Sequence, residues 1–380
     1  MEAYDAIVVG AGVMGCATAY HLARRGRRVL LLEQFAVGHE RGSSHGHSRI
    51  IRLAYDAPDY VRLAQAAYPL WRELEAESGA ALLLPTGGLD LAMPGTPSFE
   101  RTRASLAEVG VAFEELDGNA IRERFPPFQL PEGIRGIYQA DAGILSASHC
   151  VATLAAEARR HGAVVHEGEA ARELAPLGHG VRVRTTVATY AADRLIVTAG
   201  SWARPLLRQL ELDLPLVVTK EQIAFFTPHD PAPFEPGRFP IFIHHAVGRW
   251  AGYGFPIFGL PGVKVAQHGG GPRVEPDSDD RAVVAERLEE LRAYVAQVLP
   301  QAAGEVMFAQ TCRYTSTPDE HFIIDHHPEH PQIVIGSPCS GHGFKFGVLI
   351  GKILADLAEQ GTTDQPIGMF GLGRFAGGRQ

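Results

Sequence analysis

Short apolar runs and one helical stretch alternate over the first 33 residues. Residues 6–9 form an apolar run, small and apolar residues recur at helical spacing over 17–23, and residues 29–32 form a second apolar run. Glycines at 10, 12 and 15 separate the first run from the helical stretch as G-x-G-x-x-G. A strand–turn–helix–strand unit with this glycine spacing predicts a dinucleotide-binding fold.

Each glycine of this unit has a physical role beside a pyrophosphate. Gly10 permits the tight turn, Gly12 lets the backbone approach the phosphates, and Gly15 lets the helix pack on the strand. The N-terminus of the helix directs its N–H groups at the phosphates. Glu33 ends the second apolar run, where a carboxylate binds ribose hydroxyls, so we expect FAD or NAD rather than NADP. The unit alone does not separate FAD from NAD.

The segment after Glu33 is polar and rich in glycine and histidine, without clear periodicity over residues 38–48. A loop of this length in a compact unit is usually functional or disordered. We interpret it as a loop over the cofactor, with Ser43 and His45 as cofactor-binding candidates and with Arg49 and Arg52 directed at an anionic group. The alternative is a solvated basic loop. Carboxylate or cysteine partners at ligand spacing are missing, so we expect no metal.

Helical periodicity recurs later in the chain and predicts helices over residues 60–78, 99–109, 147–161 and 280–298. Residues 82–93 resemble a pair of strands around two glycines. Residues 216–265 are aromatic and β-like, broken by proline and glycine, which suggests an antiparallel sheet in a second domain. The last third returns to the pattern of the first domain, with strands around 321–338 and a small-residue helix over 347–357.

Composition and charge exclude several classes of protein. The chain has 380 residues, of which 46% are hydrophobic and 21% charged, and its net charge is −8, which argues against a nucleic-acid-binding surface. No apolar stretch approaches ~20 residues, so we expect no membrane span. Four scattered cysteines without C-x-x-C spacing suit a reduced cytoplasm, which we expect as the location.

Three later segments combine reactive side chains with strand or glycine-turn patterns, and they contain Lys264, His268, Cys312, Tyr314, Gly341, Gly343 and Lys345. Lys264 and His268 are four positions apart on an alternating strand, so they share a face and can point into one pocket. The glycines beside His342 suggest a close backbone approach to a planar ligand. The alternatives are a solvated strand face, a small buried cysteine and a loop with one solvated lysine.

At these segments the chain resembles the family of monomeric sarcosine oxidase and N-methyltryptophan oxidase, among the D-amino-acid-oxidase-like flavoenzymes. The resemblance runs nearly end to end. In family order it comprises GAGVMG with Glu33, GSSHGHSRIIRLAY, GYGFPIFG, GVKVAQH, TCRYT with TPDEHFIIDHHPEH, and SGHGFKF. The last two motifs together are highly specific.

The resemblance implies roles for individual positions. Cys312 matches the cysteine that carries FAD through an 8α-S-cysteinyl bond, and Lys264 matches the lysine over the flavin that activates oxygen. Arg52 and Lys345 match the pair that holds the substrate carboxylate. The remaining catalytic candidates are an arginine near the flavin ring and pocket residues around the methylamine: Arg49, Tyr253, His268 and Tyr314.

Pattern and resemblance together predict an α/β fold, with a Rossmann-like FAD-binding domain and a discontinuous, mainly antiparallel-sheet substrate domain. We expect the FAD-binding domain to comprise residues 1–85, 146–215 and 311–380, and the substrate domain to comprise 86–145 and 216–310. Pro338 and Cys339 depart from the family pattern, and His244 and Trp250 occupy a variable stretch at the pocket entrance. These departures leave the preferred amine open.

The resemblance implies an FAD-dependent oxidase of secondary N-methyl amino acids, with sarcosine as the first expectation and peroxide as a product. N-methyltryptophan or a cyclic imino acid such as pipecolate or proline is the alternative substrate. A flavin-binding subunit of an amine dehydrogenase complex is the alternative from another class. We expect a monomer whose partners are a small amino acid and oxygen.

Overall fold

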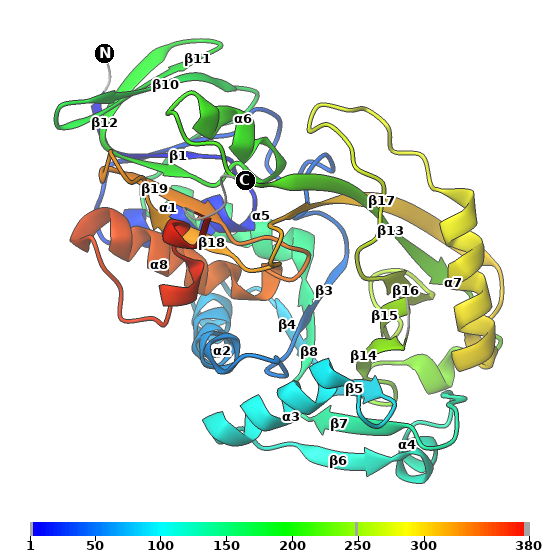
Figure 1. The fold of residues 1–380 in the computed structure, drawn as a ribbon. Coiled ribbons are helices and arrows are strands. Elements are labelled where there is room, and N and C mark those ends of the chain that lie inside the picture. Colours follow the sequence, from blue (N-terminus) through cyan, green and yellow to red (C-terminus); the bar gives the residue numbers. More distant parts are fainter. Residues whose placement is uncertain (1–2, 248–249, 376–380) are drawn as a thin grey trace.

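The computed structural model describes residues 3–247 and 250–375, and at 246, 247 and 250 the backbone only. Three sheets and the helices around them form this part of the chain (Figure 1). The α/β class predicted from the sequence is confirmed. No helix among the described residues is long and apolar enough to cross a membrane.

The first sheet has eight strands and a parallel centre. β1 (Ala3–Val9) lies between β12 (Thr189–Val197) and β2 (Val29–Leu32) and pairs with both in parallel. The remaining strands are β9 (Val164–His166), β10 (Ala171–Leu177), β11 (Gly180–Thr185), β18 (Ile323–His326) and β19 (Ile333–Ser337). All four residues of β2 are buried, which explains why this strand is a continuous apolar run in the sequence.

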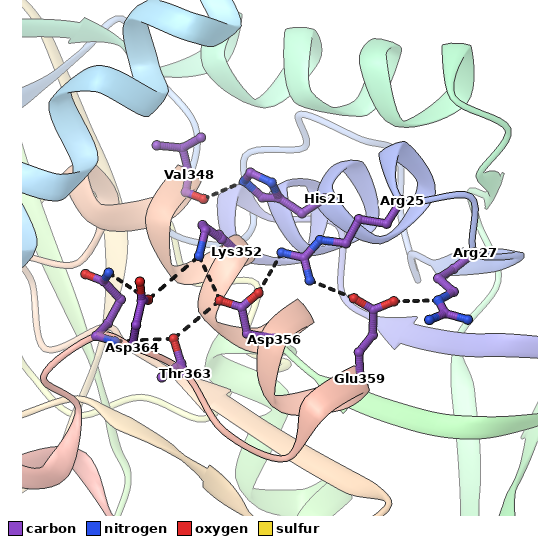
Figure 2. A network of polar contacts seen from close by, with 10 residues as sticks. His21, Arg25, Arg27, Val348, Lys352, Asp356, Glu359, Thr363 and Asp364 are labelled. Atoms are coloured by element: carbon purple, nitrogen blue, oxygen red, sulfur yellow. Dashed lines mark hydrogen bonds and ion pairs between the residues drawn. The ribbon is translucent and has the colours of Figure 1, made fainter.

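Three helices cover one face of this sheet: α1 (Val13–Arg24), α5 (Ala147–Arg160) and α8 (Gly347–Gln360). Small residues let α1 and α8 approach closely, since a Cβ on Gly351 would lie 2.4 Å from Ala17. Ion pairs join Arg25, the residue that caps the C-terminus of α1, to α8, as Figure 2 shows. Arg25 lies 2.7 Å from both Asp356 and Glu359. The helix that follows the glycine motif is therefore held by the C-terminal helix.

The second sheet also has eight strands, and all but one of its pairings are antiparallel. In spatial order the strands are β17 (Val306–Ser316), β13 (Val217–Phe226), β16 (Val263–Gln267), β15 (Trp250–Phe255), β14 (Ile241–Val247), β5 (Gly88–Ala92), β7 (Arg135–Gln139) and β6 (Glu114–Asp117). Helix α7 (Ala285–Val298) packs against β16 along the outer side of the sheet (Figure 1). The mainly antiparallel second sheet is as predicted.

A small third sheet connects the two large ones. Its strands are β3 (Ser48–Ile51), β8 (Gly143–Ser146) and β4 (Leu83–Pro85). The predicted strand pair over 82–93 is wrong in its pairing, because β4 bonds to β8 and β5 bonds to β7 and β14. The expected division into two discontinuous domains stays a prediction. Its boundary at 311 falls inside β17, which pairs with β13 over its length.

The predicted helices over 60–78, 99–109 and 147–161 are confirmed with small shifts, as α2 (Pro58–Ser78), α3 (Pro97–Val109) and α5. Two short helices were not predicted, α4 (Gly118–Arg124) and α6 (Ala203–Arg208). The helix expected from residue 280 begins later, at Ala285. Asp280 instead forms a turn, in which its carboxylate accepts from the N–H of Ala282 at 3.0 Å and from Lys220 at 2.5 Å.

Candidate functional site

One cavity of about 760 Å³ gathers nearly all of the predicted site residues. Its lining includes Gly10, Gly12, Glu33, Ser43, His45, Arg49, Arg52, Tyr253, Lys264, His268, Cys312, Tyr314, Gly341, Gly343 and Lys345. The predicted residue outside this lining is Gly15, which lies where α1 meets β1. A Cβ on Gly15 would lie 1.8 Å from the carbonyl oxygen of Gly10, so its role is close packing.

The glycine motif forms the part of the cavity that fits a dinucleotide. Gly10 has a φ of 99°, and a Cβ there would lie 2.7 Å from the carbonyl oxygen of Thr198. The Glu33 carboxylate accepts from the N–H groups of Ala11 at 2.8 Å and Phe35 at 2.9 Å. These bonds hold the carboxylate between two loop segments at the ends of β1 and β2. Its remaining lone pairs are suited to ribose hydroxyls.

Arg49 holds the loop that the sequence placed over the cofactor. Its Nη2 donates to the carbonyl oxygens of Ser43 and His45, both at 2.7 Å, and its Nη1 donates to that of Ser48 at 2.9 Å. Three carbonyl acceptors on one guanidinium give this irregular loop a defined backbone. Ser43 is also tied to β17, since its hydroxyl donates to the carbonyl oxygen of Arg313 at 2.5 Å.

His45 is a polar side chain with unused hydrogen-bonding capacity. It is 4% exposed, and neither ring nitrogen has a hydrogen-bond partner among the described residues. Burial, followed by the positive charge of Arg49, lowers its pKa to about 3, so the ring is neutral near pH 7. A neutral imidazole offers one donor and one acceptor. This orphaned polar group and the glycine cradle fit a bound flavin nucleotide.

Lys264 lies on β16 and is buried without an acidic partner. Its Nζ donates to the carbonyl oxygen of Ser48 at 3.0 Å and to the Ser48 hydroxyl at 3.1 Å, and it lies 4.4 Å from the ring centre of Phe255. No ion pair among the described residues includes Lys264. Burial and then the charge of Arg49 lower its pKa well below the usual value. A positive charge on this side chain is therefore poorly solvated, and the two hydrogen bonds to Ser48 are the contacts that support it.

Aromatic and sulfur groups from three strands lie near this lysine. Cys312 and Tyr314 are on β17, Tyr253 is on β15, and His268 follows β16. Tyr253 and Tyr314 share a hydrogen bond, and the rings of His268 and Tyr314 are 5.6 Å apart. Burial lowers the pKa of His268 to about 4 and raises that of Tyr253 to about 12, so both are neutral near pH 7. Burial also raises the pKa of the Cys312 thiol.

Two further cations line the cavity, each with a different partner. Arg52 Nη1 donates to Asp90 Oδ1 at 2.9 Å and to the carbonyl oxygen of Ala54. Lys345 Nζ donates to the Tyr55 hydroxyl at 2.6 Å and to the carbonyl oxygen of His342 at 2.7 Å. Burial, and next the charge of Arg52, lowers the pKa of Lys345 well below the usual value. In the described part of the chain, no carboxylate forms an ion pair with Lys345.

The turn that carries Lys345 requires its glycines. Gly341 has a φ of 76°, and a Cβ there would lie 2.3 Å from the Tyr314 ring. A Cβ on Gly343 would lie 1.7 Å from the carbonyl oxygen of Pro338. The turn leads into α8 through a short 3₁₀ segment, Phe344–Phe346. Glycine here allows the backbone to pass directly beside the cavity.

Sequence reasoning missed three residues that hold the cations of the cavity: Ser48, Tyr55 and Asp90. Asp90 carried a signal, because it is the one carboxylate in the otherwise apolar strand of residues 88–92 and is 2% exposed. Tyr55 lies three residues after Arg52, but its contact with Lys345 could not be inferred from the local pattern. His244 lines the cavity as predicted for the entrance stretch, and the Trp250 side chain is outside the described residues.

Comparison with known proteins identifies the family. A family model described as FAD dependent oxidoreductase matches residues 5–357. Monomeric sarcosine oxidase of Streptomyces avermitilis is 38% identical over 378 residues, which is 98% of this chain and 98% of that protein. Peroxisomal sarcosine oxidase of Homo sapiens is 36% identical over 378 residues, 98% of this chain and 97% of that protein.

A solved structure has the same fold. The open form of NikD, an unusual amino acid oxidase essential for nikkomycin biosynthesis, matches with a TM-score of 0.86 and 28% identity over 98% of both chains. The glycine cradle, the orphaned histidine and the full-length matches agree with one another. The chain belongs to the family of FAD-dependent oxidoreductases.

Proposed function

We propose that this protein is an FAD-dependent oxidase of secondary N-methyl amino acids, with sarcosine as the expected substrate. Sarcosine, water and oxygen would give glycine, formaldehyde and hydrogen peroxide. The observation that carries the proposal is a pair of cations, Arg52 and Lys345, that line the same cavity as the buried ammonium of Lys264. Two relatives named sarcosine oxidase support the same reaction.

The chain has groups suited to hold FAD along the cavity. The N–H groups at the start of α1 suit the pyrophosphate, and the Glu33 carboxylate suits the ribose of the adenosine. The loop held by Arg49 presents Ser43 and His45, and the Gly341–Gly343 turn supplies close backbone. When bound, FAD would supply the redox chemistry, which is acceptance of two electrons from the CH–NH group of the substrate and their transfer to oxygen.

Cys312 is the residue we propose as the covalent attachment point. Its thiol lines the cavity on β17, beside the charges of Arg49 and Lys264, which act against the rise in its pKa caused by burial. Forming a thioether with the flavin 8-methyl carbon removes the thiol proton, one methyl hydrogen and two electrons, and oxygen can accept the electrons. Cys339, which also lines the cavity, is the second candidate.

The substrate carboxylate would be held by Arg52 and Lys345. A guanidinium offers two parallel donors and an ammonium adds a point charge, a combination that suits a carboxylate in a poorly solvated cavity. The neutral amine is the reactive form, and burial beside cations lowers the pKa of an amine. Neutral His268, Tyr253 and Tyr314 would then orient it without adding charge.

Lys264 would serve the oxygen half of the reaction. Negative charge develops on oxygen as it accepts electrons, and a preorganised ammonium stabilises that charge as it forms. The two hydrogen bonds to Ser48 orient the ammonium before oxygen arrives. This role requires the lysine to be protonated.

A substrate panel tests the proposal. The purified chain, loaded with FAD, would be given sarcosine, N-methyltryptophan, pipecolate and proline in air, and peroxide would be measured. We expect the fastest release with sarcosine. Faster release with N-methyltryptophan or pipecolate would move the assignment to that substrate, and reduction of an artificial acceptor without peroxide would favour a dehydrogenase subunit. The name of the bacterial relatives favours a monomer, and we propose the same here, in the cytoplasm.

A further inference from the structure

Tyr55 contacts both cations that are proposed to hold the substrate carboxylate. Its hydroxyl oxygen accepts a hydrogen bond from Lys345 Nζ at 2.6 Å. The Arg52 guanidinium lies over its ring. The central carbon of the guanidinium is 4.8 Å from the ring centre, within the range of a cation–π contact. Tyr55 is 6% exposed, so both contacts are made away from bulk water. One buried side chain therefore links the two cations.

The direction of the hydrogen bonds around Tyr55 follows from His342. The Nε2 atom of His342 lies 3.1 Å from the carbonyl oxygen of Glu320, which can only accept, so this nitrogen carries the proton. Nδ1 is then an acceptor, and it lies 3.4 Å from the Tyr55 hydroxyl. Tyr55 can direct its own proton to Nδ1, or to the carbonyl oxygen of His342 at 3.5 Å, and in both cases its oxygen lone pairs remain for Lys345. Burial lowers the pKa of His342 well below the usual value, which agrees with a single ring proton.

Aromatic packing keeps the Tyr55 hydroxyl in place. Tyr60 stacks on the Tyr55 ring with centroids 5.2 Å apart and an interplanar angle of 22°. Phe346 packs against the same ring at 5.5 Å. A ring held in this way cannot move its hydroxyl independently of the core. Lys345 therefore donates to an acceptor whose position is determined by packing.

Lys345 and Arg52 each keep N–H donors that their protein contacts do not use, and these donors can bind a ligand. Of the three N–H donors of Lys345, Tyr55 and the carbonyl oxygen of His342 take two. Arg52 uses Nη1 for Asp90 and for the carbonyl oxygen of Ala54. Within residues 3–247 and 250–375, neither Nε nor Nη2 of Arg52 donates a hydrogen bond. One ammonium proton and one edge of the guanidinium remain for a carboxylate.

We propose that Tyr55 is a positioning residue for the substrate carboxylate. Its hydroxyl places Lys345 and its ring face places Arg52, so that the remaining donors of both cations meet on one carboxylate. The inference rests on the proposed function, because it assumes that the ligand of this pair is an amino acid. It adds that the hydroxyl also helps to keep Lys345 charged, since the hydroxyl is an acceptor for the ammonium in a position with little water.

The test compares two tyrosine variants of the FAD-loaded protein. Tyr55→Phe removes the hydroxyl and keeps the ring. Tyr68→Phe is the matched control, because the Tyr68 hydroxyl donates to the carbonyl oxygen of Asp141 at 3.0 Å and contacts neither cation. The probe is methoxyacetate, which has the shape of sarcosine with oxygen in place of the amine. Calorimetric titration at several pH values gives Kd, and steady-state kinetics with sarcosine give KM and kcat.

We expect Tyr55→Phe to raise the Kd of methoxyacetate about tenfold or more and to raise KM more than it lowers kcat. We also expect the pH above which binding is lost to move downward, which a merely structural residue would not cause. Tyr68→Phe should change Kd less than about twofold. An unchanged Kd in Tyr55→Phe, an equal loss in both variants, or a parent that binds no methoxyacetate would overturn the inference.

Failure of the proposed function is a separate result. It would appear as a parent protein that releases no peroxide from any N-methyl amino acid, whatever the Kd values are. Should Tyr55→Phe not fold, His342→Phe tests the same chain of hydrogen bonds, because it removes the ring acceptor of the Tyr55 hydroxyl and keeps an aromatic ring against Phe322. A weakened Kd is expected there too, and an unchanged Kd would contradict the inference.

Discussion

Lys264 donates from Nζ to two oxygens of Ser48, the carbonyl at 3.0 Å and the hydroxyl at 3.1 Å. This pairing places a buried lysine against β3 of the small third sheet without a neutralising carboxylate. A carboxylate partner could hold the lysine in the same position, but its negative charge would cancel the positive charge of the ammonium. The arrangement suits a reaction in which negative charge appears only transiently near Nζ.

The Lys264→Met variant should separate the two halves of the reaction. Anaerobic reduction by sarcosine should continue at a similar or somewhat lower rate, and reoxidation in air should slow by ~10²–10³, the typical loss on removing one preorganised donor. Stopped-flow absorbance follows both steps. Parent-like reoxidation with a collapse of reduction would mean that Lys264 serves the amine.

Reoxidation should also depend on pH in a defined direction. Because burial lowers the pKa of Lys264 well below its usual value, the charged fraction falls as pH rises through that lowered pKa. The parent should therefore reoxidise more slowly as pH rises, already below the pKa of a free lysine. The Lys264→Met variant should lack this decline. A decline of equal size in the variant would assign the titration to another group.

If Arg52 and Lys345 hold the substrate carboxylate, replacing either residue should weaken the binding of ligands that carry a carboxylate and of no others. Arg52→Ala or Lys345→Ala should weaken binding of sarcosine and of methoxyacetate by ~2–5 kcal/mol, the usual cost of losing one partner of a buried charged hydrogen bond. The binding of N-methylethylamine, which lacks the carboxylate, should be almost the same in either variant as in the parent. Lys352→Ala is a control, since Lys352 pairs with Asp356 on α8. Equal losses on both kinds of amine would argue against a clamp.

Covalent attachment at Cys312 predicts a simple chemical result. Protein precipitated with acid should remain yellow and carry the additional mass of FAD, measured by mass spectrometry. Cys312→Ser should lose the covalent flavin, whereas Cys339→Ser should keep it. Retention of the bound mass in Cys312→Ser with loss in Cys339→Ser would move the attachment to Cys339.

Local features of the fold could be predicted from the sequence because their signals are local. The glycine spacing of residues 10–15 and the apolar period of 147–161 each depend on neighbouring residues. The pairing of residues 82–93 could not be predicted, because β4 and β5 pair with strands more than 40 residues away, in two different sheets. Strand character was visible there, but the partners were not.

The site shows the same division between local and distant information. Lys264, Cys312 and Lys345 stood out as reactive residues in distinctive motifs. Their immediate partners did not, since Ser48 and Tyr55 lie 216 and 290 residues from the lysines they contact. No periodicity encodes such contacts. The carboxylate of Asp90 in the otherwise apolar run of residues 88–92 was a sign in the sequence that a cation lay nearby.

The most direct test of the central claim is the product balance with sarcosine in air. Oxygen uptake, peroxide, formaldehyde and glycine would be measured together on the purified, FAD-loaded chain, with catalase omitted. The proposed function predicts one molecule of each product for every oxygen consumed. Peroxide without formaldehyde would contradict N-demethylation, and reduction of the flavin without oxygen uptake would contradict an oxidase.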